Sequence, residues 1–249
     1  MGGCRTATET MLTGCAASVA DVRHRVRAIV HRVGGEAVRR TWASLTRIAG
    51  IGPDSRSGRR FGRFGTGSII CFPPNTIFNE RYIHIGEGTM IGPDVTLSAG
   101  MVPGQQCLSD PVVRIGDRCL IGKGSGIVGH FSIEIGDDVW TGHHVYITDQ
   151  NHGYEDVERP ISLQTQPERA VSIGSGSWLG FGTVVLPGAR IGEHVTIGAN
   201  SVVTGEIPSF SVAVGAPARV VRRYAPDTGW VSVDRGDPDV PERRLTDRS

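Results

Sequence analysis

A six-residue repeat is the feature of this sequence that most restricts its fold. From Ile173 to Pro208 the chain divides into six consecutive hexads, each opened by an aliphatic residue: IGSGSW, LGFGTV, VLPGAR, IGEHVT, IGANSV and VTGEIP. Hexads of the same kind occur upstream, opened by Ile85, Ile91 and Leu97, by Ile115, Ile121 and Ile127, and, after a shift of two residues, by Ile135, Thr141 and Ile147. Chance produces two or three such hexads, whereas six in succession identify an internal repeat.

A period of six is neither helical nor the simple alternation of a half-buried strand. It predicts short strands joined by turns, with one aliphatic side chain of each strand directed inward and a glycine often following where the backbone bends. Three strands, about 18 residues, complete one triangular coil, and stacked coils pair their strands in parallel. We therefore expect an all-β core in the form of a parallel β-helix, with an antiparallel β-sandwich as the weaker alternative.

The segment before the repeat has a helical pattern. Apolar residues recur at helical spacing from Val19 to Ile48, interrupted by Gly34-Gly35, which predicts two short helices. We expect the small and polar residues 1–18 to be disordered. Arginines lie between the apolar positions, and we interpret them as the solvated face of a helix packed on the main domain; a membrane-surface helix is the alternative.

These patterns predict three parts. Residues 1–66 form an N-terminal tail, short helices and a connector; residues 67–223 form the β-helix domain, with an extruded loop at 148–170; residues 224–249 form a C-terminal tail. The loop is expected because the hexads stop after Ile147, and a long, polar, non-periodic insertion in a compact repeat domain is often functional.

Composition narrows the setting. The formal net charge of +1 does not favour a nucleic-acid or acidic-lipid partner. The five cysteines are irregularly spaced and include no CxxC pair, so we expect neither a disulfide framework nor a zinc knuckle, and a cytoplasmic protein. Because the sequence has no long apolar run, we expect no signal peptide and no membrane span.

The hexads resemble those of the hexapeptide-repeat acyltransferases over roughly residues 67–223. The segments ITDQNHGY (147–154), VSIGSGSWLGFGTVVLPGARIGEHVTIGANSVVTGEIP (171–208) and VAVGAPARVVRR (212–223) are most similar to the maltose and galactoside O-acetyltransferases and the polysaccharide O-acetyltransferases. The resemblance implies a left-handed β-helix, acetyl-CoA as acyl donor, no required metal, and a homotrimer. The implied reaction moves an acetyl group from acetyl-CoA to a hydroxyl of a sugar, glycolipid or polysaccharide.

The resemblance places the chemistry in the extruded loop. His152 matches the catalytic histidine of the family, and a neutral imidazole can take a hydroxyl proton near pH 7. Asp149, Glu155 or a main-chain carbonyl could orient its ring. Asn151 and Tyr154 flank the histidine and could bind a sugar acceptor, although turn formation and loop packing explain them equally well.

Residues outside this segment complete the candidate site. The expected acceptor-binding residues are Asp149, Asn151, Tyr154 and His130. His130 and His143 lie on the coils before the loop, where stacking could bring either one near His152. The residues that match cofactor-binding positions of the family are Trp178, Gly180, Ala199, Thr204 and Arg222. Phe181 and Gly205 depart from the family pattern, which usually has a small residue and a lysine there.

Three other functions are compatible with these patterns. An N-acetyltransferase acting on an amino sugar or antibiotic would use a similar loop. Three histidines on a β-helix, His130, His143 and His144, also suggest a γ-class carbonic anhydrase-like metalloenzyme, although their spacing differs from that class. A non-catalytic β-helix scaffold is the third alternative, and it would have no need of His152.

Overall fold

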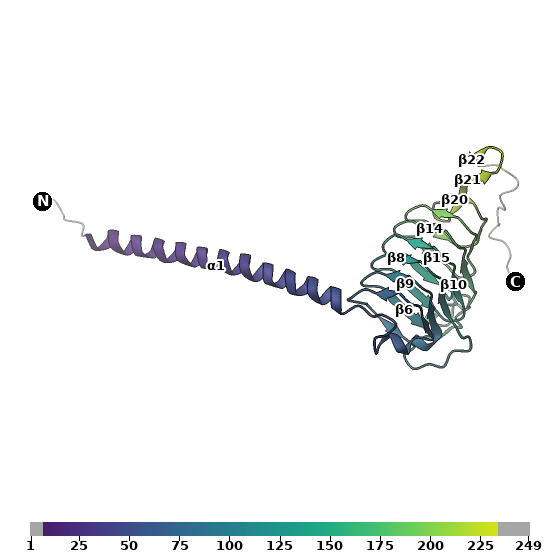
Figure 1. Cartoon of the computed structure of the whole chain (residues 1–249), viewed down its shortest axis with the longest axis horizontal. Coiled ribbons are helices and arrows are strands. Elements are labelled where there is room, and N and C mark those ends of the chain that lie inside the picture. The colour runs from purple at the N-terminus through teal and green to yellow at the C-terminus, as the bar shows by residue number, and fades with distance from the viewer. Residues whose placement is uncertain (1–6, 234–249) are drawn as a thin grey trace. The chain divides into compact units, whose positions relative to one another are not determined.

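The computed structural model describes residues 7–233 and divides the chain into two compact units, which meet between Ile48 and Ala49. The first unit is the helix α1, and the second is a solenoid of stacked coils (Figure 1). Among the described residues no helix is long and apolar enough to cross a membrane.

Helix α1 is continuous from Ala7 to Ile48, so the prediction of two short helices is wrong. Gly34 and Gly35 do not end it, because a glycine inside a helix costs only about 1 kcal/mol relative to alanine. Glu36 accepts hydrogen bonds from Arg39 at 2.7 Å and from Arg40 at 3.0 Å, which supports the turn after the glycines. The prediction of disorder is also wrong for residues 7–18; residues 1–6 lie outside the described part.

The second unit consists of three sheets that the chain visits in rotation. The seven-stranded sheet contains β1 (Arg63–Phe64), β4 (Ile83–Ile85), β7 (Val113–Ile115), β10 (Ile133–Ile135), β13 (Val171–Ile173), β16 (Arg190–Ile191) and β19 (Glu206–Ile207). The nine-stranded sheet contains β2 (Ile69–Ile70), β5 (Met90–Ile91), β8 (Leu120–Ile121), β11 (Trp140–Thr141), β14 (Trp178–Leu179), β17 (Thr196–Ile197), β20 (Ser211–Val214), β21 (Arg219–Ala225) and β22 (Gly229–Ser232). The six-stranded sheet contains β3 (Ile77–Phe78), β6 (Thr96–Ala99), β9 (Gly126–Gly129), β12 (Tyr146–Thr148), β15 (Val184–Val185) and β18 (Val202–Val203). Three short 3-10 turns complete the unit, at Gly58–Arg60, Glu80–Tyr82 and Ile161–Leu163.

Every pair of neighbouring strands from β1 to β20 is parallel, which confirms the predicted parallel β-helix. The three edges of the prism are named here by the sheets they join. Edge I leads from the seven- to the nine-stranded sheet, edge II from the nine- to the six-stranded sheet, and edge III from the six- to the seven-stranded sheet. The solenoid begins at β1, slightly before residue 67, and β21 and β22 extend it beyond residue 223 as an antiparallel hairpin.

The hexad-opening residues form the core. In the seven-stranded sheet five of them and Ile207 stack in register as one column, none more than 5% exposed: Ile85, Ile115, Ile135, Ile173, Ile191 and Ile207. Each such burial contributes about 1.5–3 kcal/mol. Thr141 is the polar member of the neighbouring column, and its hydroxyl accepts the Gly122 N–H at 2.8 Å, so this backbone group is paired.

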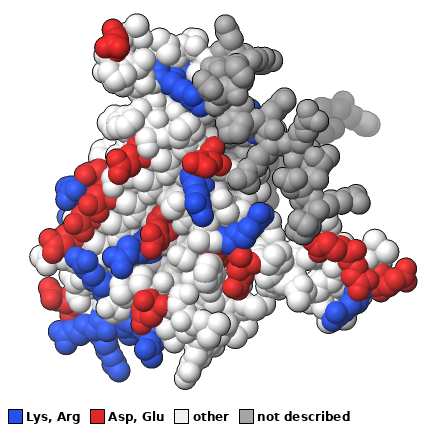
Figure 2. All heavy atoms as spheres, turned by 90° about the vertical axis from the view of Figure 1, so that its right-hand side faces the viewer, with Lys and Arg blue, Asp and Glu red and all other residues white. Residues whose placement is uncertain are grey.

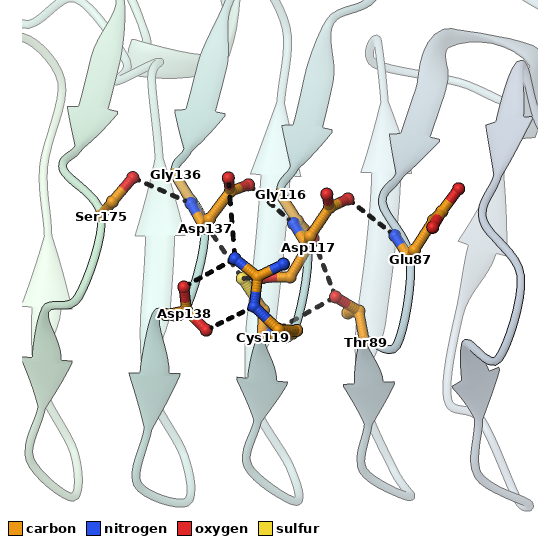
Figure 3. A network of polar contacts seen from close by, with 10 residues as sticks. Glu87, Thr89, Gly116, Asp117, Cys119, Gly136, Asp137, Asp138 and Ser175 are labelled. Carbon is orange, nitrogen blue, oxygen red and sulfur yellow. Dashed lines mark hydrogen bonds and ion pairs between the residues drawn. The ribbon is translucent and has the colours of Figure 1, made fainter.

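Side chains at edge I link each turn to the next coil. The Glu87 N–H donates to the Asp117 carboxylate, the Asp117 N–H to Asp137, and the Asp137 N–H to the Ser175 hydroxyl, at 2.8–3.1 Å (Figure 3). Arg118 makes a two-pronged ion pair with Asp138 across the same coils, at 2.8 and 2.7 Å. These bonds fix the register of the coils, which in turn fixes the position of each edge III loop.

The outer surface of the solenoid is mixed in charge. Figure 2 shows acidic and basic side chains mixed over much of one face, with basic side chains gathered at its lower left and a row of acidic side chains above them. On the seven-stranded sheet the outward column includes Arg114, Glu134 and Arg190, so unlike charges lie on nearby coils.

Candidate active site

The extruded loop lies at edge III, between β12 and β13, and it is an ordered structure. Its two arms are joined by backbone hydrogen bonds from Arg169 N to Asp149 O (2.8 Å), from Asn151 N to Pro167 O (3.3 Å) and from Gly153 N to Thr165 O (2.9 Å). A methyl group on Gly153 would lie 2.5 Å from the Thr165 carbonyl oxygen, so this position tolerates only glycine without a shift. The loop therefore presents its outer residues from a fixed base.

Asp149 anchors the first arm of the loop to the coil before it. The residue is fully buried, and its carboxylate accepts hydrogen bonds from the N–H groups of His130 (2.8 Å), Phe131 (2.8 Å) and Ser132 (2.7 Å). An acceptor molecule cannot reach a carboxylate in this position, and its oxygens are occupied. The expectations that Asp149 binds the acceptor or orients His152 are therefore corrected: it fixes the turn between β9 and β10.

His152 is exposed on the first arm, and two glutamine side chains, Gln150 and Gln166, are hydrogen-bonded in series beside it. The Gln150 side-chain NH2 donates to Asn151 O at 3.2 Å and makes a short hydrogen bond to the Gln166 side-chain oxygen. The Gln166 NH2 then lies 3.3 Å from Nδ1 of His152. When the Gln166 NH2 donates to Nδ1, the neutral ring carries its proton on Nε2.

Glu155 does not contact the imidazole either. Its carboxylate accepts the Tyr154 N–H at 2.9 Å, which stabilises the tip of the loop instead. The group that contacts the His152 ring is instead one that the sequence did not suggest, the Gln166 amide on the opposite arm. Asn151 and Tyr154 are both exposed, Tyr154 at 73%, so their side chains are available to a ligand.

The other histidines occupy different places. His130 lies at edge III beneath the loop, with its side chain only 8% exposed and its Nδ1 atom 3.9 Å from the Glu168 carboxylate. That Nδ1 atom is buried and has no hydrogen-bond partner. His143 and His144 are exposed at edge II, where the His144 ring packs against Phe181, with 5.6 Å between ring centroids. The expectation that stacking could bring His143 near His152 is not met within one chain, because the two lie at different edges.

Two of the predicted cofactor-binding residues lie in one outward column of the nine-stranded sheet. Trp178 pairs with Thr196, Thr196 with Val212, and Val212 with Arg222. Three strand spacings of about 4.8 Å separate Trp178 from Arg222, or about 14 Å. Both are exposed, Trp178 at 48%, and Arg222 Nη2 donates to Trp230 O at 3.3 Å. The column thus offers an aromatic face at one end and a guanidinium at the other.

Gly180 and Ala199 lie beside this column, at edge II on successive coils. A methyl group added to Gly180 would lie 2.6 Å from the Ala199 backbone nitrogen, so the coils are in close contact there. Phe181, which departs from the family pattern, is 52% exposed at the same edge. Thr204 lies elsewhere, at edge III between β18 and β19, on the same edge as His152.

A single chain therefore does not assemble the whole predicted site. His152, the acceptor candidates and Thr204 lie along edge III, while Trp178, Gly180, Ala199 and Arg222 lie on or beside the nine-stranded sheet. The six-stranded sheet separates these two groups. Within the part of the chain that the structure describes, no three His, Cys, Asp or Glu side chains gather into a group able to hold a metal ion.

Sequence reasoning missed Gln150, Gln166 and Glu168. Gln166 and Glu168 face the first arm only because the loop doubles back, and Gln150 pairs with Glu168 in an isolated antiparallel bridge. No local pattern marks such residues, since the return of the loop depends on tertiary contacts. The run of polar residues around Gln166 was the only available signal.

Comparisons with known proteins agree with this architecture. Family models for the bacterial transferase hexapeptide (six repeats) and for the hexapeptide repeat of succinyl-transferase match residues 170–205 and 112–148. A probable acetyltransferase of Mycobacterium tuberculosis (strain ATCC 25618 / H37Rv) is 40% identical over 142 residues, 57% of this chain. The match spans only 42% of that relative.

A second relative is matched over most of its length. The putative lipopolysaccharide biosynthesis O-acetyl transferase WbbJ of Escherichia coli (strain K12) is 35% identical over 167 residues, covering 64% of this chain and 81% of WbbJ. Among solved structures, AntD, an N-acyltransferase from Bacillus cereus in complex with dTDP and 3-hydroxybutyryl-CoA, superposes with a TM-score of 0.55 at 20% identity, over 66% of this chain and 84% of AntD. At that identity the likeness shows the fold alone, a left-handed parallel β-helix. Together, the repeats, the coil geometry and the extensive match to WbbJ show that the chain belongs to the hexapeptide-repeat acyltransferase family.

Proposed function

We propose that this protein is an O-acetyltransferase that moves an acetyl group from acetyl-CoA to a hydroxyl of a sugar, glycolipid or polysaccharide. The single observation that carries the proposal is the exposed His152, presented at edge III by a loop whose base is anchored through Asp149. The name of the relative WbbJ supports a hydroxyl acceptor on a glycan.

His152 acts as the general base in this proposal. As the acceptor hydroxyl oxygen attacks the thioester carbonyl carbon, its proton passes to the imidazole, and the carbon–sulfur bond then breaks. The sulfur leaves as a thiolate and is protonated to CoA–SH, and the acceptor becomes an acetyl ester. A base of this kind contributes about 10²–10⁴ in rate.

Proton acceptance at Nε2 requires the other ring proton to be on Nδ1. The Gln166 amide must then turn, so that its oxygen accepts from Nδ1–H instead of its NH2 donating to Nδ1. This rotation gives up the hydrogen bond from Gln150. We infer that Gln166 positions the imidazole. Binding of the sugar acceptor to the loop would favour the amide orientation in which the Gln166 oxygen faces Nδ1.

The donor groove is proposed to come from a second chain. In one chain the exposed Trp178 and Arg222 column lies on the nine-stranded sheet, whereas His152 is at edge III. A homotrimer that packs edge III of one prism beside the nine-stranded sheet of the next would unite them. The spacing of about 14 Å along the column suits an extended arm, with the Arg222 guanidinium available to phosphates.

The test is acetyl-CoA turnover with a panel of sugars, measured by mass spectrometry of the acetylated product. His152→Ala should lower kcat at least about 100-fold with its melting temperature unchanged, since the side chain is exposed. His143→Ala is the matched control, because His143 is an exposed histidine at edge II. Full turnover by His152→Ala would remove this residue from the mechanism.

A further inference from the structure

Charge along this chain is unevenly distributed, and the basic part lies on α1. Residues 23–48 contain seven arginines and one glutamate. Residues 49–249 contain 18 basic and 22 acidic side chains, so the solenoid and the residues after it are net acidic. The formal charge of +1 for the whole chain conceals this separation.

The same stretch of α1 carries large apolar side chains that are exposed. Their exposed fractions are 53% for Val26, 63% for Val30, 64% for Val33, 69% for Val38, 52% for Trp42, 42% for Leu45 and 76% for Ile48. Leaving so many large apolar groups in water in one helix is unfavourable, which indicates that another surface covers them.

The apolar residues form two faces. At about 100° per residue, Val26, Val30 and Val33 lie within about 60° of one another, as do Val38, Trp42 and Leu45. The centres of the two faces differ by about 120°, and the change falls at Gly34-Gly35 for all of these residues except Ile48, which lies on the first face. A second copy of α1 would bring like-charged arginines together, so self-pairing is a poor match.

We propose that α1 binds the surface of an anionic lipid bilayer, lying in the interface with its apolar residues in the headgroup region and its arginines at the lipid phosphates. The combination of positive charge and exposed apolar area on α1 favours an anionic lipid surface over other partners. A nucleic acid would satisfy the arginines but leave the valines and Trp42 in water, and a neutral apolar partner would leave the net positive charge of residues 23–48 unneutralised. An interfacial position also agrees with a helix too polar to span.

The experiment is co-flotation of the full chain with vesicles of phosphatidylcholine alone and of phosphatidylcholine with about 30% phosphatidylserine. We expect binding only to the anionic vesicles, with release as salt is raised. Replacing Arg23, Arg27 and Arg32 by Gln should weaken binding about 100-fold, at about 1 kcal/mol, or about five-fold, per arginine. Arg114→Gln, a single exposed arginine on the solenoid, is the control and should change nothing.

A second variant tests the apolar contribution. Val30→Ser with Trp42→Ser should reduce binding at least ten-fold while circular dichroism shows the helix retained. Equal binding to both vesicle types, no binding to either, or tighter binding to DNA than to anionic vesicles would overturn the proposal. Concentration-dependent association of chains through α1 that persists with vesicles present would do the same. Acetyl transfer is not part of this readout, so either proposal can fail without the other.

Discussion

Asp149→Ala should destabilise the solenoid more than the loss of any other single carboxylate at its turns. Asp149 is fully buried and accepts three backbone N–H groups at 2.7–2.8 Å. Removing an acceptor leaves each donor with a cost of about 1–3 kcal/mol. Because the donors are only partly buried and water can enter the space left by the side chain, we expect about 3–4 kcal/mol in total.

For a domain of this size that cost corresponds to a fall of roughly 6–16 °C in the melting temperature. Asp137→Ala is the matched control: its side chain is 51% exposed and it accepts one backbone N–H, from Asp117 at 2.8 Å. It should cost about 1 kcal/mol or less. Asp149→Asn should fall between the two, because its amide keeps one oxygen but turns an NH2 toward a backbone donor.

The assay is urea unfolding followed by far-ultraviolet circular dichroism, with thermal melts in parallel. The slope of the free energy of unfolding against urea should stay the same in all four proteins, so that the midpoints report stability alone. If Asp149→Ala and Asp137→Ala unfold at the same urea concentration, the three N–H groups that donate to Asp149 do not anchor the loop, and the reasoning is refuted.

Three further predictions concern single side chains. Gln166→Glu should keep activity and move the acid limb of the kcat/KM profile to higher pH by up to about one unit, because a carboxylate stabilises Nδ1–H and the imidazolium of His152. Gln166→Leu should lower kcat. Identical pH profiles for the wild type and both variants would exclude a positioning role for Gln166. Burial raises the pKa of the Cys119 thiol to about 11, so at pH 8 Cys119 should be alkylated far more slowly in the folded protein than in the urea-unfolded protein. Mass mapping of the labelled peptide measures both rates, and equal rates would contradict the prediction. The hydrogen bond from Arg118 lowers the pKa of Asp138, so the ion pair contributes stability above about pH 4 and loses it as the pH falls through the lowered pKa. Asp138→Asn should therefore flatten the dependence of the free energy of unfolding on pH in this acidic range. An unchanged dependence would count against the ion pair.

The repeat made the fold predictable at the level of individual side chains. Ile85, Ile115 and Ile135 could be assigned to one inward column because the period fixes both the strand and its direction. The helix was harder, since Gly34-Gly35 looks like a break in the sequence. Glycine often ends a helix by adopting the left-handed conformation, but Gly34 and Gly35 keep the helical one and α1 continues through them.

The site was predictable in its residues but less so in their roles. His152 could be found because the loop interrupts the period, whereas the buried position of Asp149 depends on three N–H groups in a different coil. The Gln166 contact depends on where the loop returns, and that is decided by packing rather than by local pattern. Trp178 and His152 lie on different sides of the prism because each strand belongs to one of three sheets in turn. Assigning the strands after the loop to their sheets requires knowing where the loop ends.

Both ends of the nine-stranded sheet are closed by antiparallel chain. At the first end Ile51 pairs with Ile70 of β2, and at the last end β21 and β22 fold back over β20. A solenoid ending in a bare parallel strand would offer its unpaired amides to another molecule and could lengthen indefinitely, as in a fibre. These two terminators limit the stack to a fixed number of coils, so a chain cut after Val214 should associate through its exposed last coil, and the closed first end should stop that association at pairs of chains.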